Sequence, residues 1–236
     1  MFFRGLRFIL LVSPFTLQAA EPQVHEFRLD NGLKLLVQED HRAPAVVAQV
    51  WYKVGSSSEY SGLTGISHML EHMMFKGTDK HQPGEFSRII AANGGRENAF
   101  TGRDYTAYFQ TLEKSKLPVS FELEADRMRN LRLTDEEFKK EQQVVLEERR
   151  LRTDDQPRAK MEEHFEAVAY TSGAYRNPVI GWPDDVANLT MTDLRRWYEL
   201  WYAPNNATVV VVGDIKSEEV HQLAKKYFGS LKTSEL

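Results

Sequence analysis

Alternating hydrophobic and polar positions near the N-terminus predict antiparallel strands. Asn31-Gly32 stands between two strand-like runs within residues 25–40, and an Asn-Gly pair in this setting is the strongest short-range signal of a hairpin. From residue 46 to residue 54 every second position is apolar, which is the period of a half-buried strand. The chain is therefore expected to open with antiparallel sheet.

Helical signals dominate the middle of the chain. Helices are predicted around residues 62–78 and over residues 83–92, 119–130, 134–151 and 157–170. An Asn-Gly-Gly run ends the second of these abruptly. Thr134 and Glu137 have the three-residue spacing of a capping box, and Pro157 suits the first turn of the last helix.

Strand character returns twice and, with the helices, predicts the fold class. Residues 96–112 and 206–215 have strand-like patterns, and Ser217 is expected to cap a final helix that ends near Phe228. Strands at both ends and in the middle of a chain, separated by runs of helices, favour an α+β fold with helices packed on one face of a mostly antiparallel sheet. No internal repeat or linker is found, so residues 21–236 are expected to form one domain.

The first twenty residues differ in composition from the rest of the chain. Arg4 and Arg7 precede a short apolar run, and Ala19-Ala20 follows it, which is the layout of a secretory signal peptide. The run is shorter than the roughly 20 apolar residues that span a bilayer, so no stable membrane anchor is expected. Residues 1–20 are predicted to be a signal peptide and the protein to be exported, with a bacterial periplasm as its destination; a frayed amphipathic start is the alternative.

The charge balance and the absence of cysteine exclude several kinds of function. The 30 Lys and Arg residues nearly balance 34 Asp and Glu residues, for a formal charge of -4. Since no basic run stands out, nucleic acid is not expected as a partner. The chain has no cysteine, which excludes disulfides, thiolate metal sites and a cysteine nucleophile.

Candidate chemistry begins in the sequence HMLEH, residues 68–72. On a helix that advances about 100° per residue, His68, Glu71 and His72 share one face. Histidines four residues apart can reach one ion, and a glutamate beside the second histidine can contact a metal-bound water. This order is the inverted zinc-peptidase motif. Alone it is a weak signal, because an ordinary helix-face network would have the same pattern.

A second predicted helix offers a further ligand. By the same rotation Glu141 and Glu148 lie at the centre of an apolar stripe, and Glu147 lies at its edge. The stripe consists of Phe138, Val144, Val145 and Leu151. Carboxylates in a buried stripe are costly unless they are paired, protonated or bound to a metal. Two of them stacked two turns apart favour a shared cationic partner, although carboxylates bonded to Arg or Tyr are the alternative.

These motifs resemble those of the pitrilysin/insulinase family of zinc metallopeptidases, which includes the mitochondrial processing peptidase. The family pattern is His-x-x-Glu-His with a ligand glutamate about 76 residues later and another glutamate seven residues before that ligand. Here Glu148 lies 76 residues after His72 and seven after Glu141. The spacing therefore selects Glu148 over Glu147, as does the helical rotation. The resemblance extends over most of residues 24–230.

The resemblance implies a role for each of these residues. It implies Zn²⁺ as the cofactor, held by His68, His72 and Glu148, with Glu71 as the general base and Glu141 holding a ligand histidine. It also implies that an extended peptide substrate pairs with the segment Asn98, Ala99, Phe100 and Thr101, although Asn98 could be a simple strand-end residue. The implied function is a zinc-dependent endopeptidase that cleaves peptides or unfolded segments through a metal-activated water.

Members of this family are usually about twice as long as this chain, which resembles their N-terminal half. Their second, similar half closes over the substrate and supplies an arginine and a tyrosine, and no equivalent of these is found here. The expected partners are therefore a peptide substrate and a second homologous domain or subunit. The alternative function is a non-catalytic or half-site subunit that needs this second domain or a partner chain for activity. A metal-storage or metal-sensing domain, which would not need Glu71, is a third possibility.

Overall fold

The computed structural model describes residues 23–236. Residues 1–20, for which we expect a signal peptide, lie outside this range, so that expectation stays a prediction. Within residues 23–236, no helix combines the length and the apolar character that crossing a bilayer requires.

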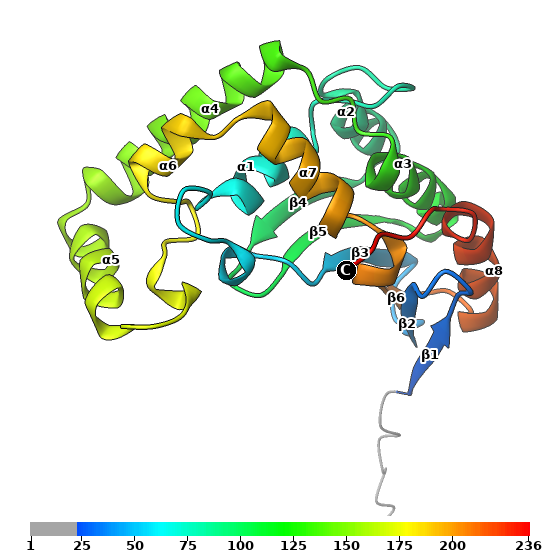
Figure 1. Cartoon of the computed structure of the whole chain (residues 1–236). Helices are drawn as coiled ribbons and strands as arrows, with labels where there is room; N and C mark the ends of the chain where they lie inside the picture. Colours follow the sequence, from blue (N-terminus) through cyan, green and yellow to red (C-terminus); the bar gives the residue numbers. More distant parts are fainter. Residues whose placement is uncertain (1–22) are drawn as a thin grey trace, which may run out of the picture.

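A six-stranded mixed sheet forms the base of the molecule, with the strand order β1-β2-β6-β3-β5-β4 (Figure 1). The strands are β1 (Val24–Arg28), β2 (Lys34–Glu39), β3 (Ala45–Tyr52), β4 (Arg96–Thr101), β5 (Thr106–Glu113) and β6 (Ala207–Gly213). Only β2 and β6 pair in parallel, while the other four pairings are antiparallel. The expected mostly antiparallel sheet and the Asn-Gly hairpin are confirmed.

Helices cover one face of this sheet, as expected. In β3 the even-numbered residues from Val46 to Tyr52 are buried, whereas the odd-numbered residues from Val47 to Trp51 are only partly covered. Such alternation arises when one side of a strand faces a core and the other does not. The helices in Figure 1 accordingly gather on one side of the strands.

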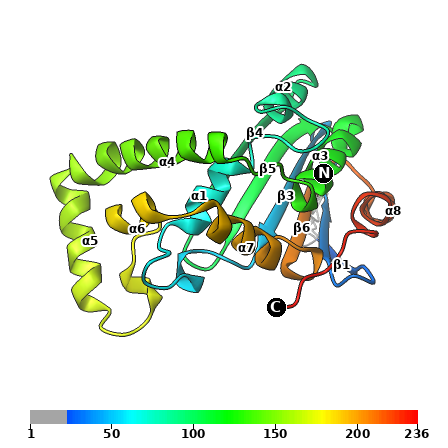
Figure 2. The ribbon, with the colours of Figure 1, turned by 45° about the horizontal axis from the view of Figure 1, so that its top comes forward.

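The helices differ in how closely they approach the sheet. The helices that contact the strands are α1 (Ile66–Met73), α2 (Glu85–Ala92), α3 (Leu117–Arg129) and α8 (Ser217–Phe228), and α7 (Met191–Trp201) packs on α1. Further out, α4 (Asp135–Arg149) contacts α1 and α6 (Pro183–Asn188) and continues through a π-helical turn, Arg150–Asp154, into α5 (Pro157–Ala169). Short 3₁₀ segments are Ser56–Ser58, Lys114–Lys116, Ala174–Arg176 and Pro204–Asn206. Figure 2 shows how α4 leads from the sheet side out to α5.

One predicted helix cap is wrong, and the other is confirmed only in part. Lys216, not Ser217, is the N-cap of α8. Ser217 is the first residue of the helix, and its backbone N–H and hydroxyl both donate to Glu39 Oε1 at 2.8 Å. Thr134 does accept from the Glu137 backbone N–H at 3.4 Å. The Glu137 side chain, however, pairs with Lys140 at 3.1 Å, so only half of the predicted capping box is formed.

The predicted apolar stripe of α4 is also partly wrong. Phe138 and Val145 are buried, but Val144 is 47% and Leu151 is 53% exposed. The reason is that α4 lies at the rim of the molecule and packs through a narrow strip, mainly against α1 and α6. The helical rotation therefore placed Glu141 correctly in the core, where it is buried, but made the stripe too wide.

Two helices, α6 and α7, were not predicted from the sequence pattern. Thr190 and Asp193 form a complete capping box at the start of α7, and Leu194, Trp197 and Tyr198 bury one side of that helix. The signal was present in the sequence, with aspartate in place of the more usual glutamate or glutamine.

Candidate metal centre

The helix α1 carries the two candidate histidines, and a carboxylate six residues before its N-cap holds its start. Its N-cap is Gly65, with φ of 84° and no capping side chain. Glu59 instead accepts hydrogen bonds from the backbone N–H groups of Gly65 at 2.7 Å and Ser67 at 2.8 Å. These are donors that a helix start leaves without intrahelical partners. Burial raises the pKa of Glu59 to about 7.

Three side chains from α1 and α4 converge at one point. His68 and His72 lie one turn apart on α1, and Glu148 reaches them from α4. Glu148 Oε2 lies 3.8 Å from His68 Nε2 and 3.2 Å from His72 Nε2, and one ligand atom from each residue lies within 4.8 Å of the others. Two imidazoles and a carboxylate are a known donor set of catalytic zinc sites. The group could therefore hold a metal ion.

Glu141 lies behind His72, where the sequence predicted it. Its Oε2 is 3.1 Å from His72 Nδ1, so the carboxylate can accept the Nδ1 hydrogen and leave Nε2 free to face Glu148. Metal-binding histidines commonly donate their second ring N–H to such an acceptor. The other oxygen, Oε1, lies 2.5 Å from Lys76 Nζ. Lys76 was not predicted as a site residue, although its position four residues after His72 was a signal.

The two histidines titrate differently. Burial lowers the pKa of His68 to about 3, so its imidazole is neutral and its lone pair is available to a metal. Burial also lowers the pKa of His72, but the hydrogen bond with Glu141 and the charge of Glu148 outweigh it, and the net pKa is raised. A metal at this position would thus compete with a proton at His72.

Glu71 points to the same place and is held from the sheet. Thr101, at the end of β4, donates its hydroxyl hydrogen to Glu71 Oε2 at 2.5 Å. Burial raises the pKa of Glu71, and the bond from Thr101 opposes that rise. A carboxylate with a raised pKa is better matched to proton transfer near neutral pH than an exposed one.

These side chains open into a cavity of about 720 Å³. His68, Glu71, His72 and Glu148 all line it, as does the whole predicted substrate segment, Asn98, Ala99, Phe100 and Thr101. Since β4 is an edge strand, the outer side of its backbone borders this cavity. Phe100 is 38% exposed, and the Asn98 side chain accepts from the Ala99 N–H at 2.9 Å. Every site residue predicted from the sequence except Glu141 lines the cavity.

Charged residues that were not predicted from the sequence form the far wall of the cavity. Arg152, just beyond α4, pairs with Glu148 Oε1 at 2.7 Å, which leaves Oε2 directed at the histidines. Arg103, in the β4–β5 turn, pairs with Glu166 of α5 at 2.6 Å. Arg152 lies four residues after Glu148, a helical spacing that was present in the sequence. The Arg103–Glu166 pair, in contrast, joins the β4–β5 turn to α5 and leaves no local sequence signal.

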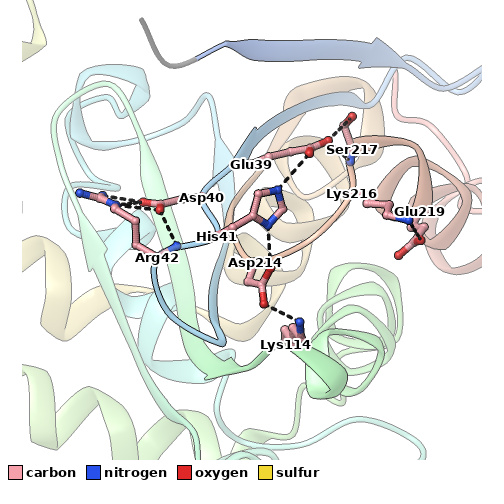
Figure 3. A network of polar contacts seen from close by, with 9 residues as sticks. All are labelled: Glu39, Asp40, His41, Arg42, Lys114, Asp214, Lys216, Ser217 and Glu219. Atoms are coloured by element: carbon pink, nitrogen blue, oxygen red, sulfur yellow. Dashed lines mark hydrogen bonds and ion pairs between the residues drawn. The ribbon is translucent and has the colours of Figure 1, made fainter. Parts of the chain in front are cut away.

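A second polar cluster lies at the opposite end of the strands (Figure 3). His41 Nδ1 is 2.6 Å from Asp214, and Lys114 pairs with the same carboxylate. The arrangement superficially resembles a Ser-His-Asp triad, since Ser217 is close by. The Ser217 hydroxyl, however, donates to Glu39 at 2.8 Å, so histidine does not activate it, and the cluster ties the surface loops together.

The fold and the convergent group have the features of a metallopeptidase domain of the inverted-motif type. A family model described as Insulinase (Peptidase family M16) matches residues 34–182, and one described as Peptidase M16 inactive domain matches residues 188–235. The chain belongs to the insulinase family, peptidase family M16.

Named relatives agree with this membership. The chain is 41% identical to the zinc protease PqqE of Helicobacter pylori, over 97% of this chain and 52% of that protein. It is 27% identical to a probable mitochondrial-processing peptidase subunit beta of Arabidopsis thaliana, over 95% of this chain and 43% of that one. These names support a peptidase function.

Solved structures agree with the fold. A protease from Helicobacter pylori matches with a TM-score of 0.89 and 41% identity, over 91% of this chain and 52% of that one. The periplasmic protease PqqL of Escherichia coli matches with a TM-score of 0.82 and 27% identity, over 90% of this chain and 25% of that one. The chain thus spans about half the length of these curated relatives.

Proposed function

We propose that this chain is the zinc-binding, catalytic half of a metalloendopeptidase. The observation that carries the proposal is the convergence of His68, His72 and Glu148 within 4.8 Å in a cavity that Glu71 also lines. A simple helix-face network would explain the ion pairs. It would not explain why the group faces an open cavity beside an edge strand. The zinc proteases among the relatives support the choice of metal and reaction.

In this proposal each residue acts on a defined atom. Zinc held by His68, His72 and Glu148 would polarise a peptide carbonyl and make a water nucleophilic near neutral pH. Glu71, through the oxygen that Thr101 does not hold, takes the proton that the attacking water loses and passes it to the leaving amine. Glu141 keeps His72 in the tautomer whose Nε2 is free.

The substrate would be an extended peptide that adds to the edge of β4. Strand addition binds through main-chain N–H and C=O groups and therefore tolerates many side chains. Ala99 and Thr101 are partly buried, while Asn98 and Phe100 are exposed, so successive substrate side chains would alternate between the two sides of the sheet. Unfolded segments can adopt this conformation, whereas folded domains cannot.

Cleavage of an unstructured peptide tests this function. The purified chain should cleave it, a chelator should stop cleavage, and zinc should restore it. Glu71→Gln should abolish cleavage while zinc is retained, because Glu71 is not a ligand. Cleavage that survives both Glu71→Gln and the chelator would contradict the proposal. Retained zinc without any cleavage, even after a homologous second half is added, would favour a storage or sensing role.

A second candidate is a half-site subunit that needs a homologous second half. The coverage of only 52% of the zinc protease PqqE favours it. Adding a separately purified second half from such a relative should then raise the cleavage rate from background. If the chain alone reaches the rate of the mixture, this candidate fails.

We also propose export to the periplasm. The leader-like residues 1–20 and the periplasmic protease among the structural relatives support it. Expression of the full chain in a bacterium, followed by N-terminal mass analysis of the periplasmic fraction, should find a mature chain that begins near residue 21. An uncleaved chain in the cytoplasm would contradict the proposal.

A further inference from the structure

Lys76 contacts the acceptor that orients a candidate metal ligand. It lies just beyond α1 and four residues after His72, and its Nζ is 2.5 Å from Glu141 Oε1. The other oxygen of the same carboxylate is 3.1 Å from His72 Nδ1. We propose that Lys76 is a positioning residue of the metal centre, which holds Glu141 in the orientation that presents His72 Nε2 to the metal. This inference rests on the zinc site proposed above.

Burial explains why Glu141 needs a second partner. Its side chain is only 10% exposed, and a buried carboxylate is costly without a counter-charge and hydrogen bonds. Within residues 23–236 its ion-pair partners are His72 and Lys76. A histidine that binds a metal through a neutral ring brings no charge of its own, so Lys76 is the cation that balances Glu141.

The local backbone explains how a flexible lysine can hold a fixed position. The Lys76 backbone N–H donates to the Met73 carbonyl at 3.0 Å, within the turn that ends α1. The next residue, Gly77, has φ of +95°, and a Cβ there would lie 2.5 Å from the His81 carbonyl oxygen. This close approach fixes the direction in which the chain leaves the helix. Lys76 follows His72 by four residues, so its backbone lies on the His72 side of α1. Its side chain is then long enough to reach Glu141 on α4.

A positioning role differs measurably from that of a structural ion pair. If Lys76 only ties α1 to α4, its loss should lower stability and leave the intrinsic affinity for zinc unchanged. If it orients Glu141, its loss should weaken zinc binding, because changes to groups behind a metal ligand typically cost about 10- to 100-fold in affinity. Zinc affinity therefore separates the two roles without any measurement of peptide cleavage.

The test is the zinc affinity of the full chain, measured by competition with a chromophoric chelator. Lys76→Met should weaken zinc binding about 10-fold or more, and Lys76→Arg, which keeps the charge, should recover most of the affinity. Lys140→Met is the matched control, since Lys140 precedes Glu141 on α4 but pairs with the exposed Glu136 at 2.7 Å. That control should bind zinc like the wild type.

A double-mutant comparison shows whether Lys76 acts through Glu141. Glu141→Gln alone should weaken zinc binding, and adding Lys76→Met to it should cost little more. Equal zinc affinity in Lys76→Met and the wild type, or fully additive losses with Glu141→Gln, would overturn the inference. Should Lys76→Met fail to fold by circular dichroism, Lys76→Gln takes its place with the same expected loss. Absence of zinc binding in the wild type would overturn the proposed function instead.

Discussion

At the scale of single residues, the side chains we assign to the metal site are held by neighbours. Glu141 contacts His72, Thr101 contacts Glu71, and Arg152 contacts Glu148. His68 is different, since its buried Nδ1 has no hydrogen-bond partner within the described part of the chain. Packing against the core therefore orients this ring, while hydrogen bonds and ion pairs orient the others.

The bond from Thr101 to Glu71 leads to a prediction about the rate of cleavage. Thr101→Val keeps the shape of the side chain and removes the hydroxyl, so Glu71 should lose its fixed orientation. We expect kcat to fall about 10-fold, less than the roughly 100- to 10,000-fold that general-base catalysis contributes, because Glu71 itself is kept; KM and zinc content should stay nearly unchanged. Thr101→Ser should restore the rate. Steady-state kinetics in the presence of any required second half measures this, and a change in KM alone would instead place Thr101 in substrate binding.

The residues that could be predicted from the sequence are those that helical periodicity brings together. His68, Glu71 and His72 share a face within one helix, and the family spacing pointed to Glu148 and Glu141. The contact of Lys76 with Glu141 was not predicted, because it depends on how the turn after α1 is placed against α4. The contact of Arg152 with Glu148 spans only four residues, so its spacing was visible in the sequence although Arg152 was not singled out. The bond between Thr101 and Glu71 joins residues 30 positions apart, and no local pattern encodes the register of β4 against α1.

At the scale of elements, the start of α1 depends on Glu59. A buried carboxylate whose pKa is raised from its usual 4.5 to about 7 favours folding while it is protonated. Its contribution is fully present below about pH 4.5 and is lost as the pH rises through 7. At higher pH the loss amounts to roughly 3 kcal/mol.

Glu59→Gln should therefore flatten part of the pH dependence of stability. The variant loses one acceptor for the N–H groups of Gly65 and Ser67, so its free energy of unfolding should be lower at acidic pH. Between pH 4.5 and 8 it should decline less steeply than that of the wild type. Urea denaturation of both chains across this range measures the difference, and parallel curves would show that Glu59 does not titrate as described.

The helix α4 shows where periodicity was misleading. Its rotation predicts that Val144 and Val145 both lie in the apolar stripe, but only Val145 is buried. Amphipathic spacing identifies which face of a helix is buried. The width of the buried face depends on how many other elements pack against the helix. At the rim of the fold α4 has few.

A matched pair of variants tests this assignment on α4. Val145→Ala should lower the free energy of unfolding by about 2 kcal/mol, because two buried methyl groups are removed and a small cavity remains. Val144→Ala should change it by less than about 0.5 kcal/mol. Denaturant titration of the two variants against the wild type is sufficient. Equal losses would contradict the exposure of Val144.

At the scale of the whole molecule, the fold class was predictable but the strand order was not. Short turns predicted the β1–β2 hairpin, and alternation predicted a sheet with one covered face. The last strand, β6, inserts between β2 and β3 and pairs in parallel with β2 across more than 160 residues of chain. No local sequence pattern predicts such a pairing, because it forms when two apolar strands that are distant in the sequence become buried side by side.

Residues of α1 and α4 together should bind one zinc ion. The zinc content per chain measures this binding. Mass spectrometry of the native chain after zinc loading should find about one zinc ion per wild-type molecule. His68→Ala and Glu148→Gln should reduce it to near zero. Glu147→Gln is the matched control, because Glu147 neighbours Glu148 but pairs with the exposed Arg150, and it should keep the zinc. A wild-type chain without zinc, or equal losses in Glu147→Gln and Glu148→Gln, would contradict a zinc site at this position.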